Sequence, residues 1–98
     1  MRAIQIFRRR VVLAVDAFID VVAWKVPEPV PPSTHRFKYR LAYVVTGACV
    51  VRFDNERGKG DHCHIDGLEL PYTFINSDQL MADFQAAVAR WNHEHSRS

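Results

Sequence analysis

The stretch RFKYRLAYVVTGACVVRFD, residues 36–54, decides the fold expected for this chain. Before Gly47, apolar and aromatic side chains occupy every second position, and the positions between them begin with cations. Such alternation is typical of a β-strand that buries one face. Gly47 interrupts the pattern, which then resumes, so the stretch predicts an antiparallel hairpin. The side chains expected on its buried face are Phe37, Tyr39, Leu41, Tyr43, Val45, Cys49, Val51 and Phe53.

A three-residue loop, residues 46–48, gives this hairpin its expected register. It places Asp54 opposite Arg40 and Glu56 opposite Lys38, so that opposite charges pair across the strands. A two-residue loop would turn the charged residues of the second strand onto the apolar face, because a shift of one residue exchanges the two faces. We therefore predict the three-residue loop.

The segments around the hairpin predict further strands. Residues 3–15 and 18–26 are rich in β-branched side chains, which favour extended backbone. The second of these segments is apolar on both faces and is expected in the centre of the sheet. Residues 27–32 contain four prolines and predict a stiff, extended connection. Residues 71–74 predict a short returning strand.

The C-terminal part of the chain predicts one amphipathic helix. Asn76 or Ser77 can cap it, because a short polar side chain accepts a hydrogen bond from the first turn. Residues 93–98 are expected to be frayed. We therefore predict a single domain over residues 1–98, with an α+β fold in which a mostly antiparallel β-sheet packs against the C-terminal α-helix. The apolar stripe of that helix consists of Leu80, Phe84, Ala87, Val88 and Trp91.

Composition limits the class of protein. A chain of 98 residues with 48% apolar residues and a net charge of +2 suits one globular domain and names no partner. The basic residues 8–10 and the apolar run after them are similar to a signal peptide, but Asp16 and Asp20 interrupt the run. No apolar stretch is long enough to cross a bilayer. With only two cysteines, Cys49 and Cys63, we expect a reducing, cytoplasmic location away from membranes.

The segment DNERGKGDHCH, residues 54–64, carries the candidate chemistry. Gly58 and Gly60 lie on either side of Lys59, so the backbone can turn sharply there and approach another molecule closely. Arg57 and Lys59 add positive charge to this turn, which suits the binding of a phosphate. The alternative is an ordinary surface loop between two strands.

His62 and His64 strengthen the case for a catalytic site. In an extended chain, residues i and i+2 point to the same face, so both imidazoles address one space. Two imidazoles near Asp61 can act as general acid and base, as RNA cleavage through the 2′-hydroxyl requires. The pair could instead bind a metal with His35, Asp61 or Cys63, but no third ligand has a persuasive spacing, so we favour a site without metal. A structural role for the pair is the remaining alternative.

Cations on the first strand of the hairpin extend the candidate site. Arg36, Lys38 and Arg40 lead toward residues 54–64, and we assign them, with Asn55, to substrate binding. Cations that contact phosphates beside aromatic side chains suit single-stranded RNA. The aromatic residues between these cations are expected in the core instead.

Several motifs resemble the TumE family of bacterial toxins. They are WKVP at residues 24–27 with the proline tract, HRFKYRL at 35–41, RFDNERGKGDHCH at 52–64 and PYTF at 71–74. The resemblance covers residues 20–92 and implies the toxin of a type II toxin–antitoxin pair. It also implies a DNA-binding antitoxin, of the helix-turn-helix kind, as partner and RNA as the usual target. No catalytic residue is carried over from the family.

The sequence thus predicts a small, metal-independent endoribonuclease toxin without a cofactor. His62 and His64 would share the roles of base and acid, and Asp61 would orient one imidazole. Arg57 and Lys59 would hold the scissile phosphate. The sequence is compatible with a homodimer. Two alternatives stay open, namely a non-catalytic module that binds nucleic acid or protein, and a metal-dependent nuclease or transferase that uses His62 and His64.

Overall fold

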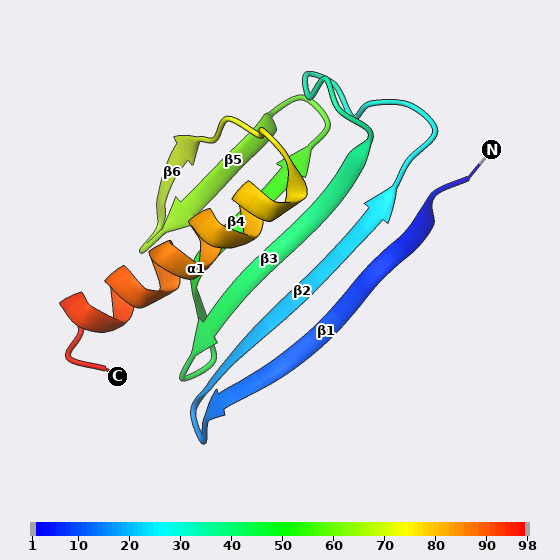
Figure 1. Ribbon diagram of the computed structural model, residues 1–98. Coiled ribbons are helices and arrows are strands. Elements are labelled where there is room, and N and C mark those ends of the chain that lie inside the picture. The colour runs from blue at the N-terminus through cyan, green and yellow to red at the C-terminus, as the bar shows by residue number, and fades with distance from the viewer. Residues whose placement is uncertain (1, 98) are drawn as a thin grey trace.

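The computed structural model describes residues 2–97, and six strands of this region form one antiparallel sheet. Each strand pairs with the next along the chain, so the order in the sheet is β1-β2-β3-β4-β5-β6 (Figure 1). The single helix follows the last strand. The elements are β1 (Ile4–Ala14), β2 (Ala17–Lys25), β3 (Phe37–Val45), β4 (Ala48–Glu56), β5 (Gly60–Ile65), β6 (Leu68–Pro71) and α1 (Ser77–Glu94).

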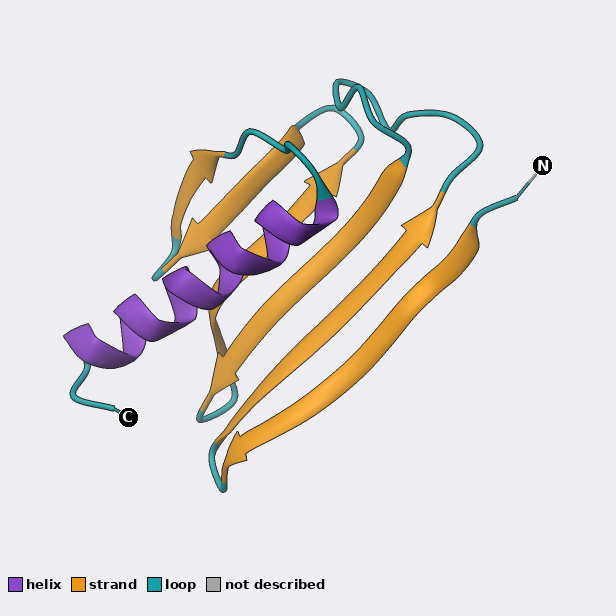
Figure 2. Cartoon of the chain, viewed as in Figure 1, coloured by secondary structure: helices purple, strands orange, loops and turns teal. Residues whose placement is uncertain are grey.

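Helix α1 packs across one face of the sheet and creates the core there (Figure 2). Its first turn is capped by Asn76, whose side chain accepts a hydrogen bond from the Gln79 N–H at 2.7 Å. The predicted cap, the apolar stripe and the α+β class are confirmed. No helix in the described part of the chain is long and apolar enough to cross a membrane. The helix buries Leu80, Phe84, Val88 and Trp91 against the sheet residues Tyr39, Leu41, Tyr43, Val51 and Phe53.

The turn between β3 and β4 differs from the prediction. It contains two residues, Thr46 and Gly47, and both have positive φ angles, 51° and 78°. Two such residues form the hairpin turn that matches the twist of the strands. A β-bulge just after Tyr43 then shifts the pairing by one residue, so that Arg40 lies opposite Asp54. The predicted register at Arg40 and Asp54 is confirmed, although the three-residue loop is wrong.

The two cysteines differ in burial, and Cys49 does not lie on the buried face expected for it. Cys49 is exposed, because the bulge removes it from the face that the helix covers. Cys63 is buried in the core and pairs across the strands with Phe53. Burial raises the pKa of the Cys63 thiol, so this residue acts as a small apolar side chain.

The strands after β4 also differ from the expectation. Residues 60–65 form β5, and the last strand is β6 at residues 68–71. The strand expected at residues 71–74 is therefore wrong. Its alternating Tyr72 and Phe74 belong to an irregular segment, and both pack on the core as the chain passes from β6 to the helix.

The C-terminal end is anchored to the turn between β1 and β2. Helix α1 continues to Glu94, and the His95 ring stacks on Trp91 at 3.8 Å. The guanidinium of Arg97 binds Asp16 at 2.6 and 3.1 Å, and these bonds lower the pKa of that carboxyl. Part of the tail expected to be frayed is thus held in place, and its last residue, 98, lies outside the described residues.

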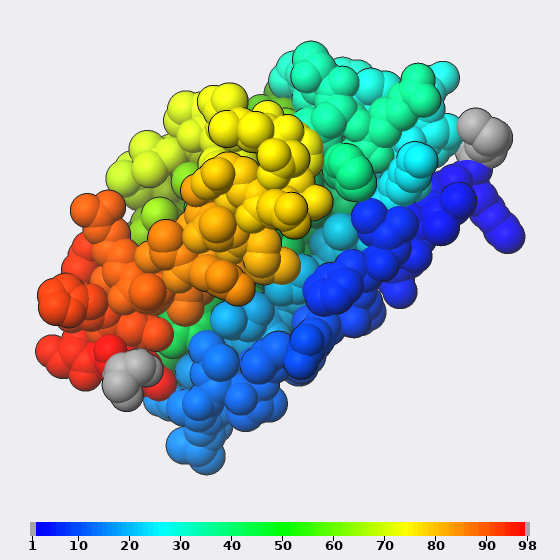
Figure 3. Space-filling model, in the orientation of Figure 1, coloured from blue at the N-terminus to red at the C-terminus, as the bar shows by residue number. Residues whose placement is uncertain are grey.

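Helix α1 leaves the strands at one side of the sheet uncovered. Strand β1 is exposed along almost its whole length, and in Figure 3 it borders the helix as a separate ridge. A groove with a volume of about 320 Å³ separates β1 and β2 from the helix. It is lined mainly by Phe7, Arg9, Val11, Leu13, Ile19 and Met81.

Candidate active site

Strand β5 divides the expected site between the two faces of the sheet. Cys63 packs in the core beneath the helix, and Asp61 points to that same face. His62 and His64 point to the opposite face, which no helix covers, because successive side chains of a strand alternate. We call this uncovered side the open face. In Figure 1 the helix lies in front of the sheet, so the open face is turned away from the viewer.

Asp61 is the centre of a hydrogen-bond network on the helix side. Its carboxylate accepts bonds from the Ser33 hydroxyl at 2.5 Å, the Tyr39 hydroxyl at 2.7 Å and the His35 Nε2 at 2.7 Å. Burial alone would raise the pKa of Asp61, but these three bonds outweigh it and hold the pKa below its ordinary value. Burial, together with the bond to Asp61, raises the pKa of Tyr39.

His35 has no ring nitrogen free for catalysis. Its Nδ1 accepts the backbone N–H of Phe37 at 3.2 Å, so the proton of the neutral ring must be on Nε2, which donates it to Asp61. The ring also stacks on Phe74 at 3.8 Å. Asp61 therefore orients His35 and fastens the proline-rich loop to the sheet. The contact predicted between Asp61 and His62 or His64 is wrong.

Asp54 takes the expected place of Asp61 on the open face. Its Oδ1 lies 2.7 Å from His62 Nε2, and its Oδ2 lies 3.2 Å from Arg52 Nε. The His64 ring is 5.0 Å from the His62 ring. The side chains of His62 and Asp54 are only 4% and 6% exposed, whereas His64 is 24% exposed. We call Asp54, His62 and His64 the histidine cluster.

The polar atoms of this cluster face one another without hydrogen bonds. His62 Nδ1 lies 3.0 Å from the Gly60 carbonyl oxygen, which can only accept, so Nδ1 carries a proton and Nε2 points at Asp54. The 2.7 Å approach of these two groups is not aligned as a hydrogen bond. In the described region, buried atoms without a bonding partner are Arg52 Nε, Asp54 Oδ1, His62 Nε2 and His64 Nε2. Buried polar atoms in this state indicate a site for a proton, a water molecule or a cation.

Charged side chains form the rim of the histidine cluster. Glu69 Oε1 lies 3.8 Å from His62 Nε2 and 3.9 Å from His64 Nε2. Glu56 Oε1 is also 3.8 Å from His62 Nε2. Lys59 reaches this rim, since its Nζ lies 3.5 Å from Glu69. Lys59 is thus linked to the rim through Glu69.

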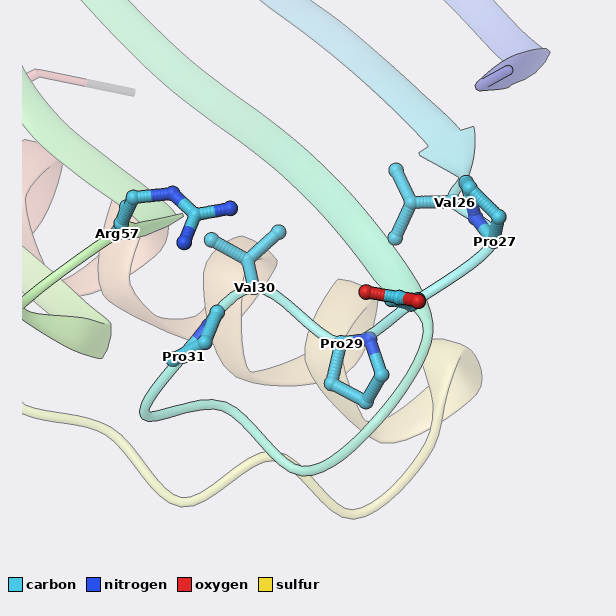
Figure 4. A pocket seen from close by; sticks show the side chains of 7 residues that line it. Val26, Pro27, Pro29, Val30, Pro31 and Arg57 are labelled. Atoms are coloured by element: carbon cyan, nitrogen blue, oxygen red, sulfur yellow. The ribbon is translucent and has the colours of Figure 1, made fainter. Parts of the chain in front are cut away.

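Arg57 faces a different space. It lines a cavity of about 600 Å³ together with the proline-rich loop, and Figure 4 shows its guanidinium reaching over Val30. The Gly58 N–H donates to the Pro31 carbonyl at 2.8 Å and holds the two loops together. Arg57 and Lys59, which we expected on one phosphate, thus point into different environments. The remaining lining residues are Val26, Pro27, Glu28 and Pro29.

The residues expected to bind substrate differ in their access to solvent. Arg36 and Arg40 are exposed, and Arg40 shares the open face with Asp54. Lys38 is half-buried and donates to the Asn55 carbonyl. Asn55 itself is completely buried, and its side chain bonds to the backbone of β3. Asn55 therefore aligns two strands and has no surface to offer a substrate.

The comparison with known protein families agrees with the resemblance in the sequence. A family model described as Toxin TumE matches residues 3–92, nearly the whole chain. The chain belongs to the TumE toxin family. No curated protein and no solved structure gives a significant match. The TumE match supports a toxin role, and it includes both the histidine cluster and the Asp61 network.

Sequence reasoning missed several members of this TumE site. Asp54 was expected opposite Arg40 and within the segment 54–64 but without a role in the site, Arg52 was given no role, and β5 was not paired with β4. The alternation of the hairpin places Asp54 on the face away from the helix, and the pairing of β4 with β5 then sets it opposite His62. Arg8 and Arg10 of β1, which lie on the same face, were missed as well. One row across the sheet consists of Arg8, Val22, Arg40, Asp54 and His62.

Proposed function

We propose that this TumE-family protein is the toxin of a type II toxin–antitoxin pair and that it cleaves RNA in the cytoplasm. Its partner would be a DNA-binding antitoxin with a helix-turn-helix. The observation that carries the proposal is the histidine cluster, in which two imidazoles and a carboxylate present unpaired atoms beside cations. The family match supports the toxin role, and the chemistry of these side chains supports RNA as the target.

The reaction needs two proton transfers. One imidazole takes the proton of a 2′-hydroxyl, whose oxygen attacks the phosphorus, and the other gives a proton to the leaving 5′-oxygen. His64 is the more open of the two histidines, so we expect it to contact the RNA directly. His62 is held by the Gly60 carbonyl, and Asp54, 2.7 Å from its Nε2, would take the orienting role that we expected of Asp61 once Nε2 is protonated.

Cations on the open face would hold the RNA backbone. Lys59 stands at the rim of the cluster and is the closest candidate for the scissile phosphate. Arg40 and Arg8 follow in the same row across the sheet. Four strand spacings separate β1 from β5, or about 19 Å, and Arg8 and Arg40 lie at intervals along this row, where each could contact a phosphate of an extended RNA strand.

A metal-dependent nuclease is the second candidate. The sequence disfavoured it because no third ligand had a suitable spacing. Asp54 now supplies that ligand, since its oxygen and the nitrogens of His62 and His64 all lie within 4.8 Å of one another. This geometry removes the reason for preferring a site without metal, and a chelator distinguishes the two mechanisms.

The test is incubation of the purified protein with total RNA, with and without EDTA. The variants are His62→Ala/His64→Ala and, as a matched control, His93→Ala, which removes an exposed imidazole from the end of α1. We expect the cleavage rate of the double variant to fall about 100- to 10,000-fold and that of the control to stay unchanged. Circular dichroism checks that both variants fold.

The outcomes separate the candidates. Cleavage that survives EDTA but not the double substitution supports metal-free catalysis by the imidazoles, whereas cleavage that EDTA abolishes supports the metal-dependent nuclease. Cleavage that persists in the folded double variant refutes the site. Salt-sensitive RNA binding without any product would leave only a binding module.

Phosphate contacts by Arg8 and Arg40 have their own readout. Arg8→Gln/Arg40→Gln should lower the slope of log K against log salt by about 1.4, because each lost phosphate contact contributes about 0.7 for a single strand. Arg90→Gln is the matched control, since Arg90 is exposed on α1. An unchanged slope in the double variant would exclude these arginines from RNA binding.

A further inference from the structure

We infer that Asp54, His62 and His64 form a binding site for a divalent transition metal of the zinc class. Their ligand atoms lie within 4.8 Å of one another, and two of the three residues are buried. Two imidazole nitrogens and one carboxylate oxygen are a donor set that zinc takes when a fourth position stays open. This inference concerns occupancy of the cluster and does not require that the protein cleaves RNA.

His62 is oriented as a metal ligand. Its Nδ1–H donates to the Gly60 carbonyl at 3.0 Å, and a bond of this kind commonly fixes the ring of a ligating histidine. The lone pair of Nε2 then points into the cluster, where Asp54 Oδ1 lies 2.7 Å away without a hydrogen bond. Two lone pairs repel at this distance unless a proton or a cation lies between them. A shared cation about 2.1 Å from each atom satisfies both.

His64 completes the set after a small movement. Ligand atoms of a tetrahedral zinc site with 2.1 Å bonds are about 3.4 Å apart. The atoms of the 2.7 Å pair must move apart by about 0.7 Å, and the His64 nitrogen, within 4.8 Å of the other ligand atoms, is too distant by at most about 1.4 Å. The His64 Nε2 has no hydrogen bond and the side chain is 24% exposed, so an inward rotation of the ring breaks no hydrogen bond of this nitrogen. Glu69 borders the open fourth position.

The surrounding charges favour a cation. The carboxylates of Asp54, Glu56 and Glu69 lie 2.7, 3.8 and 3.8 Å from His62 Nε2, whereas Arg52 and Lys59 contact the carboxylates from outside the cluster. Arg52 contacts only the outer oxygen of Asp54, at 3.2 Å, and leaves Oδ1 for the site. Arg52 thus orients the Asp54 carboxylate through the oxygen that does not face the metal, as residues outside the ligand set commonly do in metal sites.

The other ligands considered from the sequence do not take part. Asp61, His35 and Cys63 lie on the helix side of the sheet, where Asp61 holds His35 and the core buries Cys63. Without them the donor set contains nitrogen and oxygen only. Two imidazoles select zinc, cobalt or nickel over magnesium and calcium, which prefer oxygen ligands.

The experiment uses tag-free protein from which metal has been removed by a chelator. Isothermal titration with Zn²⁺ should show one equivalent bound with release of protons, and Co²⁺ should produce visible ligand-field absorption. Titration with Mg²⁺ should show no binding. Asp54→Asn, which keeps the shape of the side chain, and His64→Gln, at a partly exposed position, should each weaken Zn²⁺ binding at least about tenfold.

Two control variants remove other ligands. Cys49→Ser deletes the exposed thiol, and His93→Gln deletes an exposed imidazole of α1. Both should bind Zn²⁺ as the unmodified protein does. No binding by the folded protein, or binding that both Asp54→Asn and His64→Gln leave unchanged, would overturn the inference.

This titration contains no RNA, so its result does not depend on whether the protein cleaves RNA. Zn²⁺ binding without RNA cleavage would keep the metal site and reject the ribonuclease. RNA cleavage in EDTA without Zn²⁺ binding would keep the ribonuclease and reject the metal site. If the protein binds Zn²⁺ and also cleaves RNA in EDTA, added Zn²⁺ should inhibit cleavage, because the metal then occupies both imidazoles.

Discussion

Replacement of Asp61 should destabilise the protein more than any exposed charge does. Asp61 accepts hydrogen bonds from Ser33, His35 and Tyr39, and its side chain is only 10% exposed. Asp61→Ala removes the acceptor of all three donors and leaves them partly buried without partners. Asp61→Asn keeps one oxygen acceptor, and its amide can donate to Ser33, but the negative charge is lost.

The magnitude follows from these bonds. Hydrogen bonds to a charged group contribute about 1.5–3 kcal/mol each, but they are not additive. We expect a loss of about 4 kcal/mol for Asp61→Ala and about 2 kcal/mol for Asp61→Asn. In a domain of this size, 1 kcal/mol lowers Tm by about 4–8 °C, so Asp61→Ala should lower it by about 16–32 °C.

Urea and thermal unfolding followed by circular dichroism measure this loss. Asp20→Ala is the control, because the ion pair of Asp20 with Arg10 is exposed and should contribute less than about 1 kcal/mol. Tyr39→Phe in a double-mutant cycle with Asp61→Ala should show coupling, since one substitution already removes the shared bond. A loss below about 1 kcal/mol for Asp61→Ala, or strict additivity in the cycle, would refute the account of this network.

Two further predictions concern the same region. Gly60→Ala should lower the free energy of unfolding by about 1–3 kcal/mol, because Gly60 has a φ of +72° and an added Cβ would lie 2.9 Å from Pro32 Cγ. Gly58→Ala, at φ +87° with open space around it, should lower the free energy of unfolding by less. Equal losses in the two variants would refute the steric argument. The lowered pKa of Asp61 stabilises the protein fully above its unfolded value of about 3.9, and the stability is lost as pH falls through the folded pKa. The stability difference between the unmodified protein and Asp61→Asn should therefore shrink below about pH 4, and a difference that stays constant down to pH 2 would contradict this.

The sequence could predict those parts of the fold that depend on alternation. Tyr39 and Leu41 are buried because period-two patterning fixes which side of β3 faces the helix. The register at Asp54 was also predictable, because a shift by one residue would have buried charges. The bulge after Tyr43 was not, since a two-residue turn with a bulge and a three-residue loop give the same pairs further along the strands.

The candidate site was predictable only in its composition. The sequence singled out His62 and His64, whose spacing places them together on one face. It could not show that His35 binds Asp61, because 26 residues separate them and the path of the proline-rich loop decides the contact. Nor could it show Asp54 beside His62, since that contact depends on the length of the turn between β4 and β5.

Strand β1 leaves one side of the sheet without a neighbour along its 11 residues. Unpaired backbone groups on a long edge strand can template the addition of another chain and lead to fibrous aggregates. Residues 8–10 place three arginines in the middle of this edge. Two copies that paired antiparallel about Arg9 would bring six guanidinium groups together, three from each chain. Like-charge repulsion therefore protects the protein from stacking on itself at concentrations where a neutral edge would polymerise.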